Sequence, residues 1–205
     1  MALVGLTGGI GSGKSAVASI LTARGYQLVD ADLVARYVVE KGSPTLLKIV
    51  ETFGPDVLTQ EGYLDRPKLG AIVFGDSSKL DKLNSIIHPA IAAEMQRRIE
   101  ASLELDSLGI VFVDIPLLVE TGGKDRYRLD YVVVVDVPRE TQLHRLTRIR
   151  ALSEDEASAR INSQAKREDR LAMADFIVDN TGSLSDLDER VDEMLAQLLR
   201  AIERG

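Results

Sequence analysis

Residues 8–15 carry the strongest chemical signal in this chain. They read Gly-Gly-Ile-Gly-Ser-Gly-Lys-Ser and match G-x-x-x-x-G-K-[ST], the pattern of a phosphate-binding loop (P-loop). Glycines in this pattern let the backbone turn tightly enough to point successive N–H groups at a polyphosphate. Lys14 is expected to reach the β- and γ-phosphates, and the Ser15 hydroxyl is expected to bind Mg²⁺. The pattern therefore predicts a bound nucleotide with Mg²⁺ as cofactor.

Aspartates form a second chemical pattern, because one follows each of four apolar runs: Asp30, Asp114, Asp136 and Asp179. Aspartate is a common helix cap, and capping is sufficient to explain Asp136 and Asp179. Phosphoryl transfer needs one carboxylate near Mg²⁺ and another that orients or deprotonates the attacking hydroxyl. We expect Asp114, or alternatively Asp30, near the metal. Asp32, which would share a helix face with Arg36, is expected beside the acceptor.

Basic residues are concentrated in residues 139–170, a stretch predicted to be helical and interrupted by a capping-box pattern at residues 153–156. On spacing alone, this stretch could be a solvated helix pair with surface ion pairs. Beside a P-loop, it is better interpreted as a lid that closes over the nucleotide, stabilises negative charge and excludes water. The basic residues are Arg139, Arg145, Arg148, Arg150, Arg160, Lys166, Arg167 and Arg170.

The predicted elements place these groups at one edge of a sheet. Residues 3–6 form a short apolar strand, and residues 15–24 form an amphipathic helix that Gly25 is expected to end. Further buried strands are predicted at residues 26–29, 110–113, 131–135 and 176–178, with helices between them. The fold class is therefore α/β, a doubly wound five-stranded parallel sheet of the P-loop kinase type. An apolar stripe from Leu184 to Ile202 marks a last helix, to which we assign no chemistry.

Residues 31–109 interrupt this alternation with helix signals only. Ser43-Pro44 and Asp65-Arg-Pro67 are helix starts, Gly54 is a stop, and further signals are Ser77 and a helix junction at His88-Pro89. We interpret this segment as a helical insertion that binds the acceptor, with a purely structural appendage as the alternative. The single domain, residues 1–205, then has its nucleotide-binding core in residues 1–30 and 110–205. His144 is expected at the surface, and His88 in a turn or in contact with substrate.

Composition limits the remaining classes. The chain has 205 residues, 45% of them hydrophobic, which suffices for one folded domain with an insertion. It has no cysteine and no apolar run of the roughly 20 residues that a membrane span requires, which favours a cytoplasmic protein without membrane partners. A net charge of −7 argues against nucleic-acid partners. We expect a monomer or a weak homo-oligomer.

Several segments resemble the dephospho-coenzyme A kinase family in order and spacing, over nearly the whole chain. The P-loop is common to many kinases, whereas the Asp-Ala-Asp, His-Pro and Pro-Leu-Leu-x-Glu blocks are more specific. The resembling segments are residues 5–15, 30–36, 64–66, 73–74, 83–89, 116–120, Gln164, 174–175 and 179–180. The resemblance implies Mg²⁺-dependent transfer of a phosphoryl group from ATP to the ribose 3′-hydroxyl of dephospho-coenzyme A, the last step of coenzyme A synthesis.

The resemblance also implies residue roles. Asp32 would act as the base or position the hydroxyl, with Lys14 and Arg145 completing the catalytic set, and Arg36, Arg66 and His88 would contact the acceptor. The family's second lid arginine falls on Ile149, so Arg148 or Arg150 could replace it. Ser15 and Asp114 would hold the metal, and Asn180 would lie near adenine. The expected nucleotide-binding residues are Gly8, Gly9, Ile10, Gly11, Ser12, Gly13, Lys14, Ser15, Ala16 and Asn180.

Two other interpretations stay open on the residues alone. Nucleoside monophosphate, shikimate and gluconate kinases would share the P-loop and the lid. A non-catalytic nucleotide-dependent switch would share the P-loop but transfer no phosphate to a small molecule. A guanine-specific switch is disfavoured, because the sequence contains no Asn-Lys-x-Asp tetrad.

Overall fold

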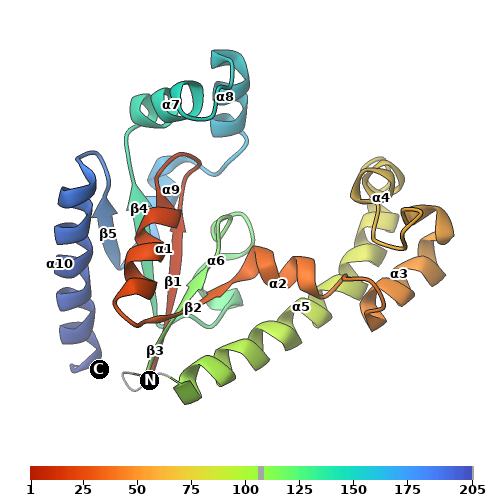
Figure 1. Ribbon diagram of the computed structural model, residues 1–205, viewed down its shortest axis with the longest axis horizontal. Coiled ribbons are helices and arrows are strands. Elements are labelled where there is room, and N and C mark those ends of the chain that lie inside the picture. The colour runs from red at the N-terminus through yellow and green to blue at the C-terminus, as the bar shows by residue number, and fades with distance from the viewer. Residues whose placement is uncertain (106–108, 205) are drawn as a thin grey trace. The chain divides into compact units, whose positions relative to one another are not determined.

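The computed structural model describes residues 1–105 and 109–204, which form two compact units (Figure 1). The first unit comprises Met1–Val29 and Ser102–Gly205, and the second comprises Asp30–Ala101. The end of the insertion expected at residues 31–109 includes residues 106–108, which lie outside the described residues. Across the described residues, no helix is long and apolar enough to cross a membrane.

A five-stranded sheet in the order β2-β3-β1-β4-β5 confirms the predicted fold class. The pairs β1/β3, β1/β4 and β4/β5 are parallel. Val132, Val133, Val134 and Val135 of β4 are completely buried, as expected of a central parallel strand covered on both faces. Each strand agrees with its predicted run to within two residues. The strands are β1 (Ala2–Gly8), β2 (Gln27–Asp30), β3 (Ile110–Asp114), β4 (Tyr131–Asp136) and β5 (Phe176–Asp179).

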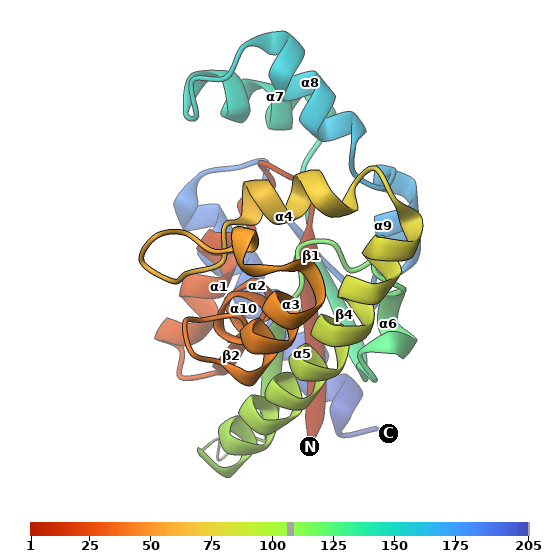
Figure 2. The same cartoon turned by 90° about the vertical axis from the view of Figure 1, so that its right-hand side faces the viewer.

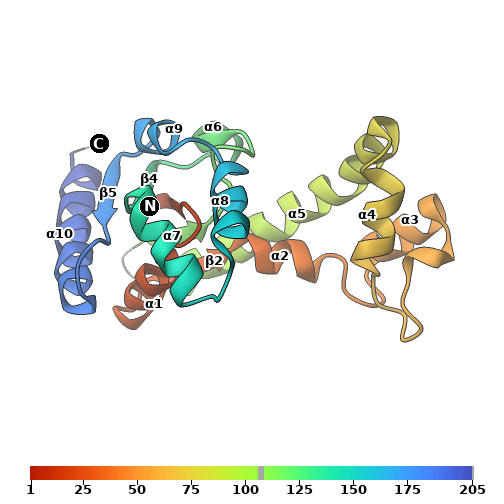
Figure 3. The same cartoon turned by 90° about the horizontal axis from the view of Figure 1, so that it is seen from above.

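Helices of the first unit lie on both faces of the sheet (Figures 2 and 3). The helices α1 and α10 pack on one face and share a buried apolar cluster with β1, β3, β4 and β5. The helices α6 and α9 lie on the opposite side of the strands. The helices of this unit are α1 (Lys14–Ala23), α6 (Gly123–Arg126), α7 (Arg139–Arg148), α8 (Glu154–Asn162), α9 (Arg167–Ala172) and α10 (Leu184–Ile202).

Helices α7 and α8 lie beyond the carboxyl end of β1, from which the P-loop emerges (Figure 1). Ser153 and Glu156 form the predicted capping box, since the Ser153 hydroxyl accepts from the Glu156 N–H and the Glu156 carboxylate accepts from the Ser153 N–H. The basic stretch has a second interruption that the sequence did not predict. Residues 163–166 separate α8 from α9.

The second unit is helical, and its local start and stop signals are confirmed. The Ser43 hydroxyl accepts from the Leu46 N–H and the Asp65 carboxylate accepts from the Lys68 N–H, so both residues cap helices. Gly54 ends α3 with a φ of 90°. The elements are α2 (Ala31–Tyr37), α3 (Pro44–Phe53), the 3₁₀ turn η1 (Pro55–Val57), α4 (Arg66–Val73) and α5 (Ser77–Leu105), the last continuing into the first unit.

Two local expectations were wrong. His88 and Pro89 form no junction, because α5 continues through them. A proline removes one hydrogen bond of the helix, and the intact turns on either side keep α5 continuous. Leu184 does not join the buried stripe of α10 and is 78% exposed. It lies in the first turn of α10, where the apolar cluster that buries Leu187 and later members of the stripe does not extend.

Candidate functional site

The P-loop connects the end of β1 to the start of α1, and its glycines meet two different constraints. Gly13 adopts a left-handed conformation with a φ of 87°, and a Cβ there would overlap the side-chain nitrogen of Asn180. Gly8 has ordinary strand geometry, but a Cβ would lie 2.6 Å from the carbonyl oxygen of Val135. The loop therefore needs glycine for backbone conformation at Gly13 and for space at Gly8.

Backbone N–H groups of the loop are available to an anion. Among the hydrogen bonds formed by the described residues, the N–H groups of Gly11, Gly13, Lys14 and Ser15 have no protein acceptor. The last two belong to the first turn of α1, where the helix dipole is positive. A polyphosphate would receive these hydrogen bonds together with the favourable dipole.

Lys14 and Asp114 form an ion pair inside the site. The Lys14 Nζ atom donates to Asp114 Oδ1, and the two side chains are only 15% and 8% exposed. Asp114 ends β3, the strand beside β1, so the sheet brings together two residues that the sequence places far apart. A pair of this kind holds the ammonium group of Lys14 in a fixed place beside the loop.

The residues expected to hold Mg²⁺ fit that ion. Mg²⁺ prefers oxygen ligands, keeps several waters and is usually completed by substrate phosphates. The exposed Ser15 hydroxyl and the Asp114 carboxylate are suitable oxygen donors. Among the described residues, no group of three or more histidine, aspartate or glutamate side chains is arranged so that it could hold a metal ion.

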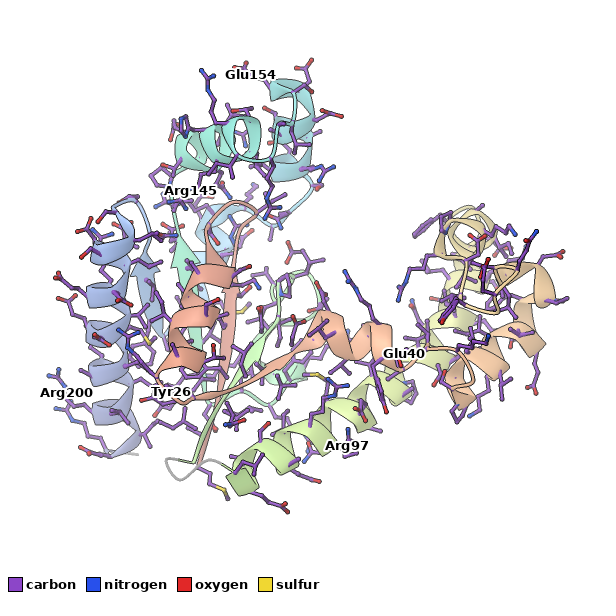
Figure 4. The ribbon with its side chains drawn as sticks, in the orientation of Figure 1. Tyr26, Glu40, Arg97, Arg145, Glu154 and Arg200 are labelled. Atoms are coloured by element: carbon purple, nitrogen blue, oxygen red, sulfur yellow. The ribbon has the colours of Figure 1, made fainter. Side chains whose placement is uncertain are left out.

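Arg145 and Asn180 contact the carbonyl groups of the P-loop. Arg145 Nη1 donates to the carbonyl oxygens of Gly11 and Ser12, both at 3.1 Å, and Nη2 donates to the Asn180 carbonyl oxygen at 2.7 Å. The Asn180 side chain donates to the Ser12 carbonyl oxygen at 2.7 Å. Figure 4 shows Arg145 on the side of α7 that faces the loop. Arg148, Ile149 and Arg150 are exposed, with Ile149 76% exposed.

The aspartates after the other strands have structural partners. The Asp30 carboxylate accepts from the Leu33 N–H at 2.9 Å and caps α2, as the capping interpretation expects. The capping expectation was wrong for Asp136 and Asp179, because α7 and α10 begin after Pro138 and Ser183. Asp136 instead accepts hydrogen bonds from the Arg167 guanidinium, the shortest at 2.6 Å, and Asp179 accepts from the Thr181 N–H. In this structure these three carboxylates bind protein groups, as Asp114 binds Lys14.

The expected acceptor residues all belong to the second unit and are exposed. Asp32 is in the first turn of α2 and Arg36 in its last turn. Arg66 is the first residue of α4, and His88 lies within α5. The structure brings Lys14, Asp114, Arg145 and Asn180 together around the P-loop in the first unit.

Four further residues bind backbone groups of Ile10 or Ala165. Only Arg170 had an expected role, as a basic residue of the lid stretch, and none was expected to make these contacts. Gln142 and Gln164 bind the backbone of Ile10, and Glu120 and Arg170 bind the backbone of Ala165. A signal for Gln142 exists in the sequence, since it precedes Arg145 by three residues and so shares its helix face. Glu120 and Gln164 belong to the segments that resemble the kinase family.

Comparison with known proteins decides the family. The family model described as dephospho-CoA kinase matches residues 2–186. The chain belongs to the dephospho-CoA kinase family. It is 50% identical over 202 residues to the dephospho-CoA kinase of Thermobifida fusca, an alignment that covers 98% of both chains. The resemblance found in the sequence is thereby confirmed, and the chain is a kinase of this family.

Solved structures agree with this assignment to the dephospho-CoA kinase family. A dephospho-CoA kinase from Campylobacter jejuni has a TM-score of 0.62 and 29% identity, with 95% of this chain and 96% of that chain covered. TT1252 from Thermus thermophilus has a TM-score of 0.77 and 32% identity over 96% and 97% of the two chains. A shikimate kinase from Acinetobacter baumannii, 13% identical with a TM-score of 0.51 over 98% and 94% of the two chains, shares the fold alone.

Proposed function

We propose that this kinase transfers the γ-phosphoryl group of ATP to the ribose 3′-hydroxyl of dephospho-coenzyme A, which gives coenzyme A and ADP. Membership in the dephospho-CoA kinase family supports the acceptor. The observation that supports ATP as the donor is the P-loop itself. At the start of α1 it holds the Lys14 ammonium group and N–H groups that have no acceptor among the described residues. These groups would bind the β- and γ-phosphates and stabilise charge as it spreads over the transferred group.

The proposed step follows from the roles of these residues. The 3′-hydroxyl oxygen attacks the γ-phosphorus, the bond from that phosphorus to the bridging oxygen breaks, and ADP leaves. Asp32 accepts the hydroxyl proton or orients the hydroxyl, while Arg36, Arg66 and His88 hold the acceptor. Arg145 stabilises the nucleotide side, and Asn180 lies near adenine. When bound by Ser15 and Asp114, Mg²⁺ supplies charge neutralisation for the phosphates.

The main experiment replaces Asp32 with asparagine. ADP release and 3′-phosphorylated product are measured with ATP and dephospho-coenzyme A. If Asp32 is the base, Asp32→Asn lowers kcat by about 10²- to 10⁴-fold and changes the KM for ATP much less. Asp30→Asn is the matched comparison, because asparagine also caps helices, and it is expected to keep near-normal kcat. Near-full kcat in Asp32→Asn would remove Asp32 from the mechanism.

The acceptor is tested separately with a panel of alcohols and phosphates. ADP release is expected to depend on dephospho-coenzyme A and not on nucleoside monophosphates, shikimate or gluconate. A preference for one of those acceptors would replace the proposed substrate. ATP binding without phosphate transfer to any member of the panel would favour a nucleotide-dependent switch.

Location and assembly also belong to the proposal. We infer a cytoplasmic protein, a monomer or weak homo-oligomer, without nucleic-acid or membrane partners, from the absence of cysteine and the net charge of −7. Cell fractionation tests the location, and sedimentation at several concentrations tests the assembly. A concentration-independent dimer or recovery with the membrane fraction would contradict these expectations.

A further inference from the structure

Ile10, in the middle of the P-loop, is held by two glutamines from the lid stretch. The Ile10 N–H donates to Oε1 of Gln164 at 2.7 Å. Nε2 of Gln142 donates to the Ile10 carbonyl oxygen, also at 2.7 Å. Gln142 lies on α7 and Gln164 lies between α8 and α9, so two separate parts of the lid stretch bind one residue of the loop. We call this arrangement the Ile10 clamp.

The loop and α7 are packed too closely for side chains to separate them. A Cβ on Gly9 would lie 2.5 Å from Nε2 of Gln142 and 2.8 Å from Nη2 of Arg170. A Cβ on Gly11 would lie 3.3 Å from the backbone oxygen of Gln142. The P-loop pattern specifies neither of these two glycines. The approach of the lid stretch explains Gly9, and at Gly11 it adds to a positive φ of 76° that already favours glycine. Gln142 is accordingly only 3% exposed.

The backbone beside Gln164 is itself fixed. The Ala165 N–H donates to the Glu120 carboxylate at 2.7 Å, and Arg170 Nη1 donates to the Ala165 carbonyl oxygen at 2.5 Å. Arg170 is 7% exposed, and burial lowers the pKa of its guanidinium. The clamp therefore combines a hydrogen-bonded backbone beside Gln164 with a buried side chain at Gln142 on α7.

The protein binds mainly the carbonyl groups of the loop rather than its N–H groups. The carbonyl oxygens of Gly9, Ile10, Gly11 and Ser12 all accept from protein donors, which are the Ser12 N–H, Gln142, Arg145 and Asn180. Most N–H groups of the loop, in contrast, donate to no protein group within the described residues. Because each peptide group has a fixed dipole, binding its carbonyl on one side directs its N–H toward the other.

We propose that Gln142 and Gln164 are positioning residues that set the phosphate-binding conformation of the P-loop and couple it to the lid. Gln142 contributes a donor that orients the peptide after Ile10, and Gln164 contributes an acceptor that removes the Ile10 N–H from competition for phosphate. This role rests on the proposed nucleotide site and does not depend on the identity of the acceptor. Loss of either hydrogen bond leaves a backbone group of the loop without its partner.

The polarity of the two contacts allows a charge-matched test. Gln142→Glu and Gln164→Glu add the same negative charge at opposite ends of Ile10. The first removes the donor that Ile10 C=O needs, whereas the second keeps an acceptor for Ile10 N–H. ADP and a non-hydrolysable ATP analogue are titrated by calorimetry, which needs no acceptor substrate. We expect Gln142→Glu to weaken binding by about tenfold or more and Gln164→Glu by less than about threefold.

Gln164→Leu completes the set, because it keeps the approximate size and removes the acceptor. It is expected to weaken nucleotide binding by about tenfold, so that Gln164→Glu acts as its conservative rescue.

Thermal unfolding of every variant separates this effect from general destabilisation, which would not follow the donor–acceptor difference. If Gln142→Glu does not fold, the two Gln164 variants still decide. Equal affinities for Gln164→Leu and Gln164→Glu, or normal affinity in Gln142→Glu, would overturn the proposal. The proposed acceptor is judged separately. If the unsubstituted protein does not phosphorylate dephospho-coenzyme A but Gln164→Glu still binds nucleotide normally, the proposed acceptor is rejected and the role of the two glutamines stands.

Discussion

At the scale of single residues, the nucleotide site depends on atoms that approach the backbone closely. Gly13 has a positive φ, and the side chain of Asn180 occupies the space where its Cβ would be. Gly25, just after α1, has nearly the same φ, 89°, but no atom lies within 4 Å of a Cβ placed there. Alanine at Gly25 would therefore suffer backbone strain alone, whereas alanine at Gly13 would suffer the same strain and a clash with Asn180.

This pair gives a direct prediction. Gly25→Ala is expected to lower the free energy of unfolding by about 1–2 kcal/mol, the cost of a left-handed alanine. Gly13→Ala has the same strain and also displaces Asn180 from the Ser12 carbonyl, so it should destabilise more and weaken ADP binding by at least about tenfold. Urea unfolding and calorimetry measure the two effects. Equal behaviour of the variants would show that the clash with Asn180 is unimportant.

Functional residues could be proposed from the sequence where a local pattern marks them, and not where only a contact distant in the sequence does. Roles could be proposed for Lys14, Ser15 and Asp114 because each stands at a recognisable place in a local pattern. Gln142 was not assigned: its position three residues before Arg145 indicates a shared helix face, but it does not identify Ile10, 132 positions away, as the partner. The same holds for Arg170, which spacing alone places on a solvated helix.

At the scale of elements, local chemistry predicted the structure well wherever it acts within a few residues. Strand runs rich in valine and the caps Ser43, Asp65 and Ser153 all gave the elements expected of them. The failure at Pro89 has a physical cause, because a proline weakens a helix locally while a long helix gains stability along its whole length. The break between α8 and α9 contains Ala165, whose backbone is bound by Glu120 and Arg170, and those contacts are not local.

Within the second unit, Arg98 of α5 contacts α2, and Glu94 of α5 binds both Arg97 and Arg98. Glu94 accepts hydrogen bonds from Arg97 and from Arg98, and the Arg98 guanidinium lies 4.9 Å from the centre of the Tyr37 ring of α2. Chiefly through the hydrogen bonds from Arg97, the pKa of Glu94 is lowered to about 2 from an ordinary value of 4.5. The ionised carboxylate therefore stabilises the folded unit.

The lowered pKa sets the sign of a pH effect. The contribution of Glu94 is complete above about pH 4.5 and is lost as the pH falls through about 2, because the unfolded chain then binds a proton more readily than the folded one. We expect Glu94→Gln to destabilise the protein by about 1 kcal/mol at pH 6, after allowance for solvent screening. The difference from the unsubstituted protein should shrink toward pH 3. Urea unfolding at several pH values measures it, and a difference that grows on acidification would contradict this role.

At the scale of the whole molecule, the two units divide the proposed chemistry. The groups suited to a nucleotide belong to the first unit, and Asp32, Arg36, Arg66 and His88 belong to the second. The net charge of −7 disfavours polyanions in general, so binding of two phosphorylated substrates has to rely on local cations. Lys14 beside the P-loop and Arg145 on α7 meet that need in the first unit.

Hydrogen exchange tests this division, since a ligand protects the amide groups that it binds or orders. ADP is expected to slow exchange in residues 8–16, because the N–H groups of Gly11, Gly13, Lys14 and Ser15 have no acceptor among the described residues. It is also expected to slow exchange in residues 139–170, where Gln142 and Arg145 bind the carbonyl groups of the loop. Dephospho-coenzyme A alone should slow exchange within residues 30–101. Peptides from residues 187–198 of α10, whose apolar face is buried in the cluster, provide the unresponsive reference. Protection by dephospho-coenzyme A confined to the first unit would contradict an acceptor role for the second. ADP protection of residues 8–16 without any change in residues 139–170 would show that nucleotide binding to the loop is not coupled to the lid.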